Sequence, residues 1–132
     1  MTSIYVDPPG LAPSAGYTHA VVRRGTPVFV TGQIALDEFG QLVGPGDIAA
    51  QVAQVWRNIS LACAGLGASL ADIVKITTFT TSRMHLEAIA AERRKHFTTG
   101  AFPASTFLVV SELASADYLV EIEPIVILRE QP

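Results

Sequence analysis

Apolar side chains recur at three- and four-residue intervals in the middle of the chain, the spacing of one face of an α-helix. The positions are Ile48, Val52, Val55, Trp56, Ile59, Cys63 and Leu66. Asp47 is a residue type that caps helix N-termini, whereas Gly65 and Gly67 suit a C-terminal end. We therefore expect a helix from Asp47 to about Gly65. Its polar side would carry Gln51, Gln54, Arg57 and Ser60.

A second helix is predicted at about residues 83–97. Its inward positions would be Leu86, Ile89, Ala90 and Phe97. Arg93, Arg94 and Lys95 gather near its end, where positive charge interacts favourably with the helix dipole. We thus expect the apolar side of this helix to pack against the core. Its last turn should be basic.

Stretches rich in β-branched and aromatic residues predict the strands. Residues 17–24 and 27–34 flank Gly25-Thr26 and predict a hairpin, and further strands are expected at residues 73–81, 105–112 and 118–128. The order is strand, strand, helix, strand, helix, strand, strand, which indicates an α+β fold. Two helices cannot cover both faces of such a sheet, so one face is left for solvent or for other copies of the chain.

Size and composition narrow the classes of protein to which this chain can belong. A chain of 132 residues is long enough for one core, so residues 1–132 are expected to form a single domain. Charged residues make up 16% and hydrophobic residues 49%, which favours some apolar surface buried between subunits. The net charge of −3 and the scattered basic residues argue against nucleic acid as a partner. Neither a leader nor a membrane-spanning run is recognisable, so we expect a cytoplasmic protein with no membrane association.

No metal or cofactor motif stands out. His19, His85 and His96 lack ligand-like spacing, and Gly44-Pro45-Gly46 is followed by Asp47 rather than by a phosphate-binding lysine. The single cysteine, Cys63, lies on the apolar face of the first predicted helix and is expected to be a buried hydrophobe. We expect neither a metal nor a cofactor.

Several segments together resemble the RidA family, also called YjgF or endoribonuclease L-PSP. They are Gly16-Tyr17-Thr18-His19-Ala20-Val21, Val30-Thr31-Gly32-Gln33-Ile34, Arg57-Asn58-Ile59, residues 67–75, Phe102-Pro103-Ala104-Ser105-Thr106 and Val120-Glu121-Ile122-Glu123-Pro124. The resemblance runs from about Leu11 to Leu128. It implies a chorismate-mutase-like fold, with a mixed sheet and two helices packed on one face, assembled as a homotrimer with clefts between neighbouring subunits.

The same resemblance supplies the candidate site residues. It implies catalytic roles for Glu121, which would position a water, and for Tyr17. Substrate would be bound by Thr31, Gly32, Gln33, Ser105, Thr106 and Phe107. From the residues alone, Glu121 and Glu123 share a strand face and one could simply be solvated, and Tyr17 could be an ordinary strand aromatic.

One position departs from the family pattern. Deaminating members carry Pro-Ala-Arg, whose arginine grips the substrate carboxylate, but this chain has Ser105 there. The change removes a fixed charge and a bidentate fork. Arg83, Arg93 or Arg94 could substitute, although arginines on a helix usually form a solvated face.

Two functions follow from these observations. The first is a cofactor-free hydrolase or deaminase for a small reactive imine or enamine other than the imine of an α-amino acid. The second is a non-catalytic small-molecule-binding or regulatory trimer that keeps the pocket between subunits. Both functions imply a small-molecule ligand in an intersubunit cleft.

Overall fold

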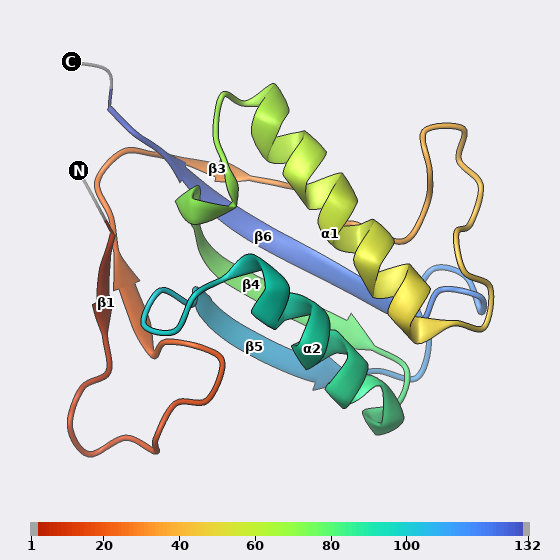
Figure 1. The fold of residues 1–132 in the computed structure, drawn as a ribbon, viewed down its shortest axis with the longest axis horizontal. Coiled ribbons are helices and arrows are strands. Elements are labelled where there is room, and N and C mark those ends of the chain that lie inside the picture. Colours follow the sequence, from red (N-terminus) through yellow and green to blue (C-terminus); the bar gives the residue numbers. More distant parts are fainter. Residues whose placement is uncertain (1–2, 131–132) are drawn as a thin grey trace.

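A four-stranded mixed sheet with two helices on one of its faces forms the body of the protein (Figure 1). The computed structural model describes residues 3–130. The strand order is β3 (Thr26–Phe29), β6 (Val120–Leu128), β4 (Ile73–Thr80) and β5 (Ala104–Val109). β5 runs parallel to β4, and the other neighbours are antiparallel. This confirms the predicted α+β class, the mixed sheet and the placement of both helices on one face.

Helix α1 (Ile48–Gly65) forms where the apolar periodicity predicts it. Asp47 caps it by accepting a hydrogen bond from the backbone N of Ala50 at 3.1 Å. Two predictions for its faces are wrong. Leu66 is 37% exposed, because the helix has already ended. Gln51 is fully buried instead of exposed, and its carboxamide is satisfied by backbone groups of Gly44, Asp117 and Leu119.

Helix α2 (Leu86–His96) is shorter than expected because residues 83–85 form a separate 3₁₀ turn, η2 (Arg83–His85). Ile89 is buried as predicted, but Leu86 is 49% exposed at the helix start. At the other end, the ring of Phe97 meets that of Trp56 on α1 edge-on, with centroids 5.4 Å apart. Aromatic contact at this end therefore helps to hold the two helices together.

The predicted hairpin of residues 17–24 and 27–34 is wrong. β2 (Ala20–Val22) pairs instead with β1 (Ile4–Val6), a strand that the sequence pattern did not indicate, and β3 pairs with β6. The guanidinium of Arg23 forms a buried ion pair with Asp72 and also binds the carbonyl of Ala71. Asp72 belongs to the 3₁₀ turn η1 (Leu70–Asp72), so this contact draws the end of β2 away from β3.

The two faces of the sheet differ in burial. Ile76, Thr78 and Thr80 of β4 are buried under the helices. Strand alternation places Phe79 on the opposite, open face, where Phe29 is 76% exposed and Leu108 is 38% exposed. Within residues 3–130, no helix is long and apolar enough to cross a membrane.

Candidate functional site

The carboxylate of Glu121 lies directly against the backbone of Gly32. Glu121 projects from β6, and any Cβ added at Gly32 would overlap its Oε2 atom. Gln33 fixes the neighbouring backbone, because its N and O atoms both bond to Ile122, at 2.9 and 3.1 Å. Among residues 3–130, no side chain forms an ion pair with Glu121. This half-buried carboxylate therefore has no ion-pair partner among the described residues and can bind water or a ligand.

A hollow of about 700 Å³ borders the same strand segment. Thr31, Gly32 and Gln33 line it together with α1 residues that include Gln54, Arg57 and Asn58. Asn58 links α1 to the segment that follows β3, because its side chain donates hydrogen bonds to the carbonyls of Ile34 and Leu36, at 3.0 and 2.9 Å. Glu121 does not line this hollow, so the chain by itself places Gly32 between the hollow and the carboxylate.

Ser105 lies on the other side of the sheet from Glu121. It pairs with Ile76, which is buried under the helices, whereas Glu121 pairs with Phe79 on the open face. Thr106 faces the open side, and its hydroxyl accepts a hydrogen bond from Lys75 Nζ at 2.7 Å. A single chain thus does not bring Ser105 to Glu121.

Phe107 is a partly buried neighbour of the hydrophobic core and pairs with Thr78. Its ring therefore contributes to packing under the helices of its own chain. The physical reason is strand alternation, which gives positions 105 and 107 the same face as Ile76 and Thr78.

Tyr17 lies in the loop before β2, next to the start of β5. The neighbouring Thr18 donates a backbone hydrogen bond to the carbonyl of Pro103 at 3.3 Å. The Tyr17 ring meets the His19 ring edge-on at a centroid distance of 5.3 Å. Tyr17 is therefore close in the fold to the segment that leads to Ser105, although the two are far apart in the sequence.

The three candidate replacement arginines differ in environment. Arg83 and Arg94 are exposed, but Arg93 is half-buried and its guanidinium lies against Gly16. Burial is the main cause that lowers the pKa of Arg93, and the positive charge of Arg94 adds to it. The expectation of a solvated face therefore holds for two of them and not for Arg93.

The remaining candidate side chains are structural. Cys63 is fully buried, as predicted, and burial raises the pKa of its thiol. His85 Nδ1 bonds with Thr80 Oγ1 at 2.8 Å, and His96 Nε2 bonds with Glu92 Oε2 at 2.7 Å. In the part of the chain that the structure describes, no three His, Cys, Asp or Glu side chains come together as a metal site.

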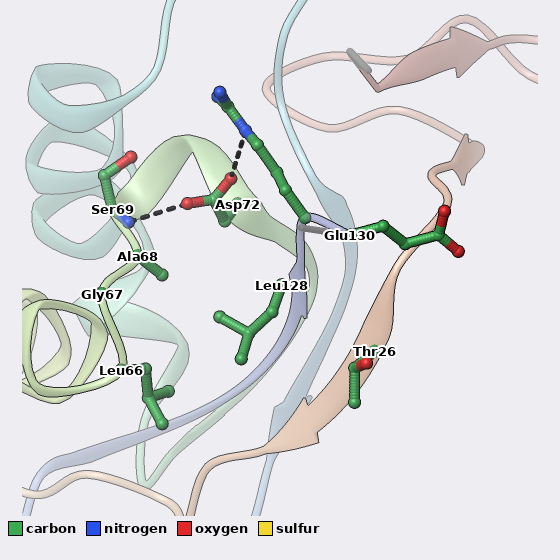
Figure 2. Close-up of a pocket in the computed structure, with 9 residues that line it drawn as sticks. Thr26, Leu66, Gly67, Ala68, Ser69, Asp72, Leu128 and Glu130 are labelled. Atoms are coloured by element: carbon green, nitrogen blue, oxygen red, sulfur yellow. Dashed lines mark hydrogen bonds and ion pairs between the residues drawn. The ribbon is translucent and has the colours of Figure 1, made fainter. Parts of the chain in front are cut away.

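A second hollow, of about 610 Å³, lies where the end of β6 passes the end of α1 and η1 (Figure 2). Leu66, Leu128 and Asp72 line it, and Asp72 also accepts a hydrogen bond from Ser69 N at 2.9 Å. The sequence did not indicate this hollow, because Thr26 and Leu128 come together there only through strand pairing.

Chemically, the arrangement around Gly32 can order a water molecule. A carboxylate accepts hydrogen bonds and can take up a proton, and a glycine leaves the backbone accessible to a small ligand. On the helix side, the loop with Tyr17, the start of β5 and Arg93 offers polar and cationic groups. These are two separate groups of side chains within one chain.

Known proteins share both the sequence and the fold. The family model described as Endoribonuclease L-PSP matches residues 9–128. A 2-iminobutanoate/2-iminopropanoate deaminase of Escherichia coli is 31% identical over 82% of this chain and 84% of its own length. The Rid-family protein YyfB of Yersinia pestis, of unknown function, has a TM-score of 0.88 and 34% identity, covering 97% of this chain and 100% of that chain.

RidA from an Antarctic Psychrobacter is similar too, with a TM-score of 0.72 and 29% identity over 89% of this chain and 92% of that chain. The sequence match covers most of the chain, and the fold agrees over the same span. The chain therefore belongs to the RidA/YjgF family, the Endoribonuclease L-PSP family.

Proposed function

We propose that the chain is a cofactor-free hydrolase that deaminates a small reactive imine or enamine. The observation that carries the proposal is the free Glu121 carboxylate held against the Gly32 backbone. The deaminases among its relatives support it, since they are about 30% identical to this chain. An enamine would first tautomerise to the imine, on which the hydrolysis then acts.

In the proposed reaction, Glu121 accepts a proton from a water molecule as the water oxygen bonds to the imine carbon. That proton passes to nitrogen to give a carbinolamine. The hydroxyl proton of the carbinolamine then also moves to nitrogen, the carbon–nitrogen bond breaks, and ammonia leaves as the carbonyl forms. The backbone near Gly32 would stabilise the polarity that develops on the substrate. Tyr17 would contribute its hydroxyl as a donor or acceptor, and Thr31 and Gln33 would complete the polar wall.

Ser105 shapes the proposed substrate range. An arginine at this position would offer a charge-assisted fork to a carboxylate, and removal of such a contact typically costs about 2–5 kcal/mol. We therefore propose that imines of common α-amino acids are poor substrates. Ser105 would bind the accepted compound from one copy of the chain, and Thr106, which faces the open side of the sheet, would bind it from a neighbouring copy.

A homotrimer is part of the proposal, because one chain places Ser105 and Glu121 on opposite faces of its sheet. A cleft between subunits would allow groups from two copies to meet. The exposed Phe29 and Leu108 on the open face support burial of that face by other copies. Light scattering during size exclusion tests this, and a mass near the 14.0 kDa of one chain would contradict it.

Substitution of Glu121 tests the proposed chemistry. Ammonia release would be measured with a neutral ketimine, benzophenone imine, and with 2-iminopropanoate formed in a coupled amino-acid oxidase assay. Glu121→Gln should abolish catalysed hydrolysis, whereas Glu123→Gln, two residues along the same strand and exposed, should retain it. Equal rates in Glu121→Gln and wild type would contradict a role for this carboxylate.

The second candidate function is a ligand-binding or regulatory trimer without catalysis. The specific observation in its favour is Ser105, which lacks the guanidinium of deaminating members. Saturable binding of small ligands without any acceleration of imine hydrolysis would favour this second function.

A further inference from the structure

The last turn of α2 contains four basic side chains, and their partners are unevenly distributed. Glu92 accepts hydrogen bonds from Lys95 at 3.2 Å and from His96 at 2.7 Å. Arg94 is exposed to solvent. Because two groups already share Glu92, this carboxylate does not neutralise Arg93.

Arg93 is a half-buried cation without an acidic partner in residues 3–130. Its Nε atom is inaccessible to solvent and has no hydrogen-bond partner there. No Asp or Glu of the described residues lies within ion-pair distance of its guanidinium. A charge held in this way usually costs free energy unless a partner compensates it.

Gly16 makes room for this guanidinium. A Cβ added at Gly16 would come within 2.8 Å of Arg93 Nη2, and the residue also has a φ of +74° that disfavours other side chains. The loop between β1 and β2 therefore accepts Arg93 at a position that only glycine suits well. Tyr17 directly follows in the chain.

The same loop connects Arg93 to the start of β5. Thr18 bonds to the carbonyl of Pro103, two residues before Ser105, and Ser105 faces the helix side of the sheet on which α2 packs (Figure 1). The cation missing at position 105 thus has a counterpart near the same end of β5, contributed by α2.

We propose that Arg93 binds the anionic group of a small ligand, a carboxylate, beside the loop that carries Gly16. A planar guanidinium binds a carboxylate through two parallel hydrogen bonds, and the guanidinium of Arg93 has no acidic partner in residues 3–130. The lowered pKa of Arg93, caused mainly by burial, agrees with a cation that gains from an anionic partner.

The proposal rests on the proposed function in one respect, because it names the acidic group that the substrate would carry. Arg93 approaches from α2 and not from β5, so its carboxylate would lie at a different position from that of an α-imino acid held at residue 105. The substrate class is then an imine or enamine with a carboxylate placed towards α2.

NMR titration with 4-oxopentanoate, a stable ketone whose carboxylate is two methylene groups from the carbonyl carbon, tests the proposal on the full chain. The readouts are the dissociation constant, the Nε–H resonance of Arg93 and the amide resonances of Gly16 and Tyr17. Wild type should bind and shift all three. Arg93→Gln should weaken binding about tenfold or more, and Arg93→Lys should fall between the two.

Arg94→Gln is the matched control, because it removes the neighbouring exposed charge from the same helix turn. It should change the dissociation constant less than twofold. Uncharged 2-butanone should bind wild type and Arg93→Gln equally weakly. Thermal unfolding of each variant checks that it is folded, and the charge-conserving Arg93→Lys keeps the test decisive if Arg93→Gln does not fold.

Three results would overturn the proposal: no binding of 4-oxopentanoate to wild type, a dissociation constant in Arg93→Gln within twofold of wild type, or an equal loss of binding in Arg94→Gln. Failure of the proposed function is distinguishable from these. Carboxylate binding that depends on Arg93, without any hydrolysis of imines, would contradict the proposed reaction alone. Hydrolysis that depends on Glu121, without carboxylate binding, would contradict the Arg93 site alone.

Discussion

Two arginines in this fold have buried side-chain atoms, and they differ in whether an acidic residue pairs with them. Arg23, at the end of β2, has a side chain only 3% exposed, and it is paired with Asp72 and bonded to Ser3 Oγ and Ala71 O. Arg93, at the end of α2, lies against Gly16 with no acidic partner in residues 3–130. The Nε atom of each arginine is buried without a hydrogen-bond partner in residues 3–130, but only Arg23 has an acidic partner there.

Glu121 resembles Arg93 in this respect, since it is a half-buried charge that rests against a glycine. A charge whose partner is built in contributes to stability, because loss of either member leaves the other uncompensated. A charge set against a glycine and without a partner has space and electrostatic reason to receive a ligand. The comparison therefore separates a structural ion pair from two candidate ligand-binding groups.

The largest expected effect is on the ion pair. Asp72→Ala should lower the free energy of unfolding by about 3–5 kcal/mol, because it leaves the Arg23 charge buried and unpaired. Arg93→Gln removes a charge that is already unpaired, and should change stability by less than about 1 kcal/mol. Urea denaturation measures both, with Arg24→Gln as the exposed neighbouring control. Similar losses in Asp72→Ala and Arg93→Gln would remove the distinction between the two arginines.

The next effect tests whether the glycine beside Glu121 is needed for activity. Gly32→Ala places a methyl group where the carboxylate lies. If Glu121 positions water, the displacement should reduce the rate of imine hydrolysis about 100-fold. Gly65→Ala is the control, because nothing lies within 4 Å of a Cβ added there. Unchanged rates in Gly32→Ala would show that this contact does not serve catalysis.

A smaller gain is expected from Ser105→Arg. Restoring a guanidinium on β5 should raise turnover of 2-iminopropanoate about tenfold, since the new side chain can hold the carboxylate. Ser111→Arg is the matched control, because this exposed serine lies just beyond the end of β5 and is not one of the proposed site residues. The coupled oxidase assay measures both. Wild-type turnover already equal to that of an arginine-bearing relative would mean that another residue, such as Arg93, binds the carboxylate.

The smallest expected effect is on the pH dependence of stability and concerns Cys63. Burial of its thiol favours the protonated form. Its folded-state pKa lies above the ordinary value of 9.0. The stability it contributes is complete below that value and is lost as pH rises through the folded-state pKa. Between pH 8 and pH 10, wild type should lose more stability than Cys63→Ala, because the thiol ionises more readily in the unfolded chain. Identical pH dependence of urea denaturation in the two proteins would contradict this assignment.

The sequence identified the segments that contribute much of the site, but it did not show how these segments are arranged in space. The sequence indicated Gly32 and Glu121, and the fold places them in contact. It also grouped Arg93 with Arg83 and Arg94, since position on a helix is all that a pattern shows. Only the loop that carries Gly16 makes Arg93 different, and loop paths depend on contacts between distant residues such as Thr18 and Pro103.

The sequence by itself determined the α+β class, the Asp47-capped helix α1, the burial of Cys63 and the family, because periodicity, capping and motifs are local properties. The tertiary structure decided the rest. It paired β2 with β1 rather than with β3, buried Gln51, and put Ser105 and Glu121 on opposite faces. These features depend on strand register, on long-range hydrogen bonds and on where each charge finds a partner, and none of them is set by neighbours along the chain.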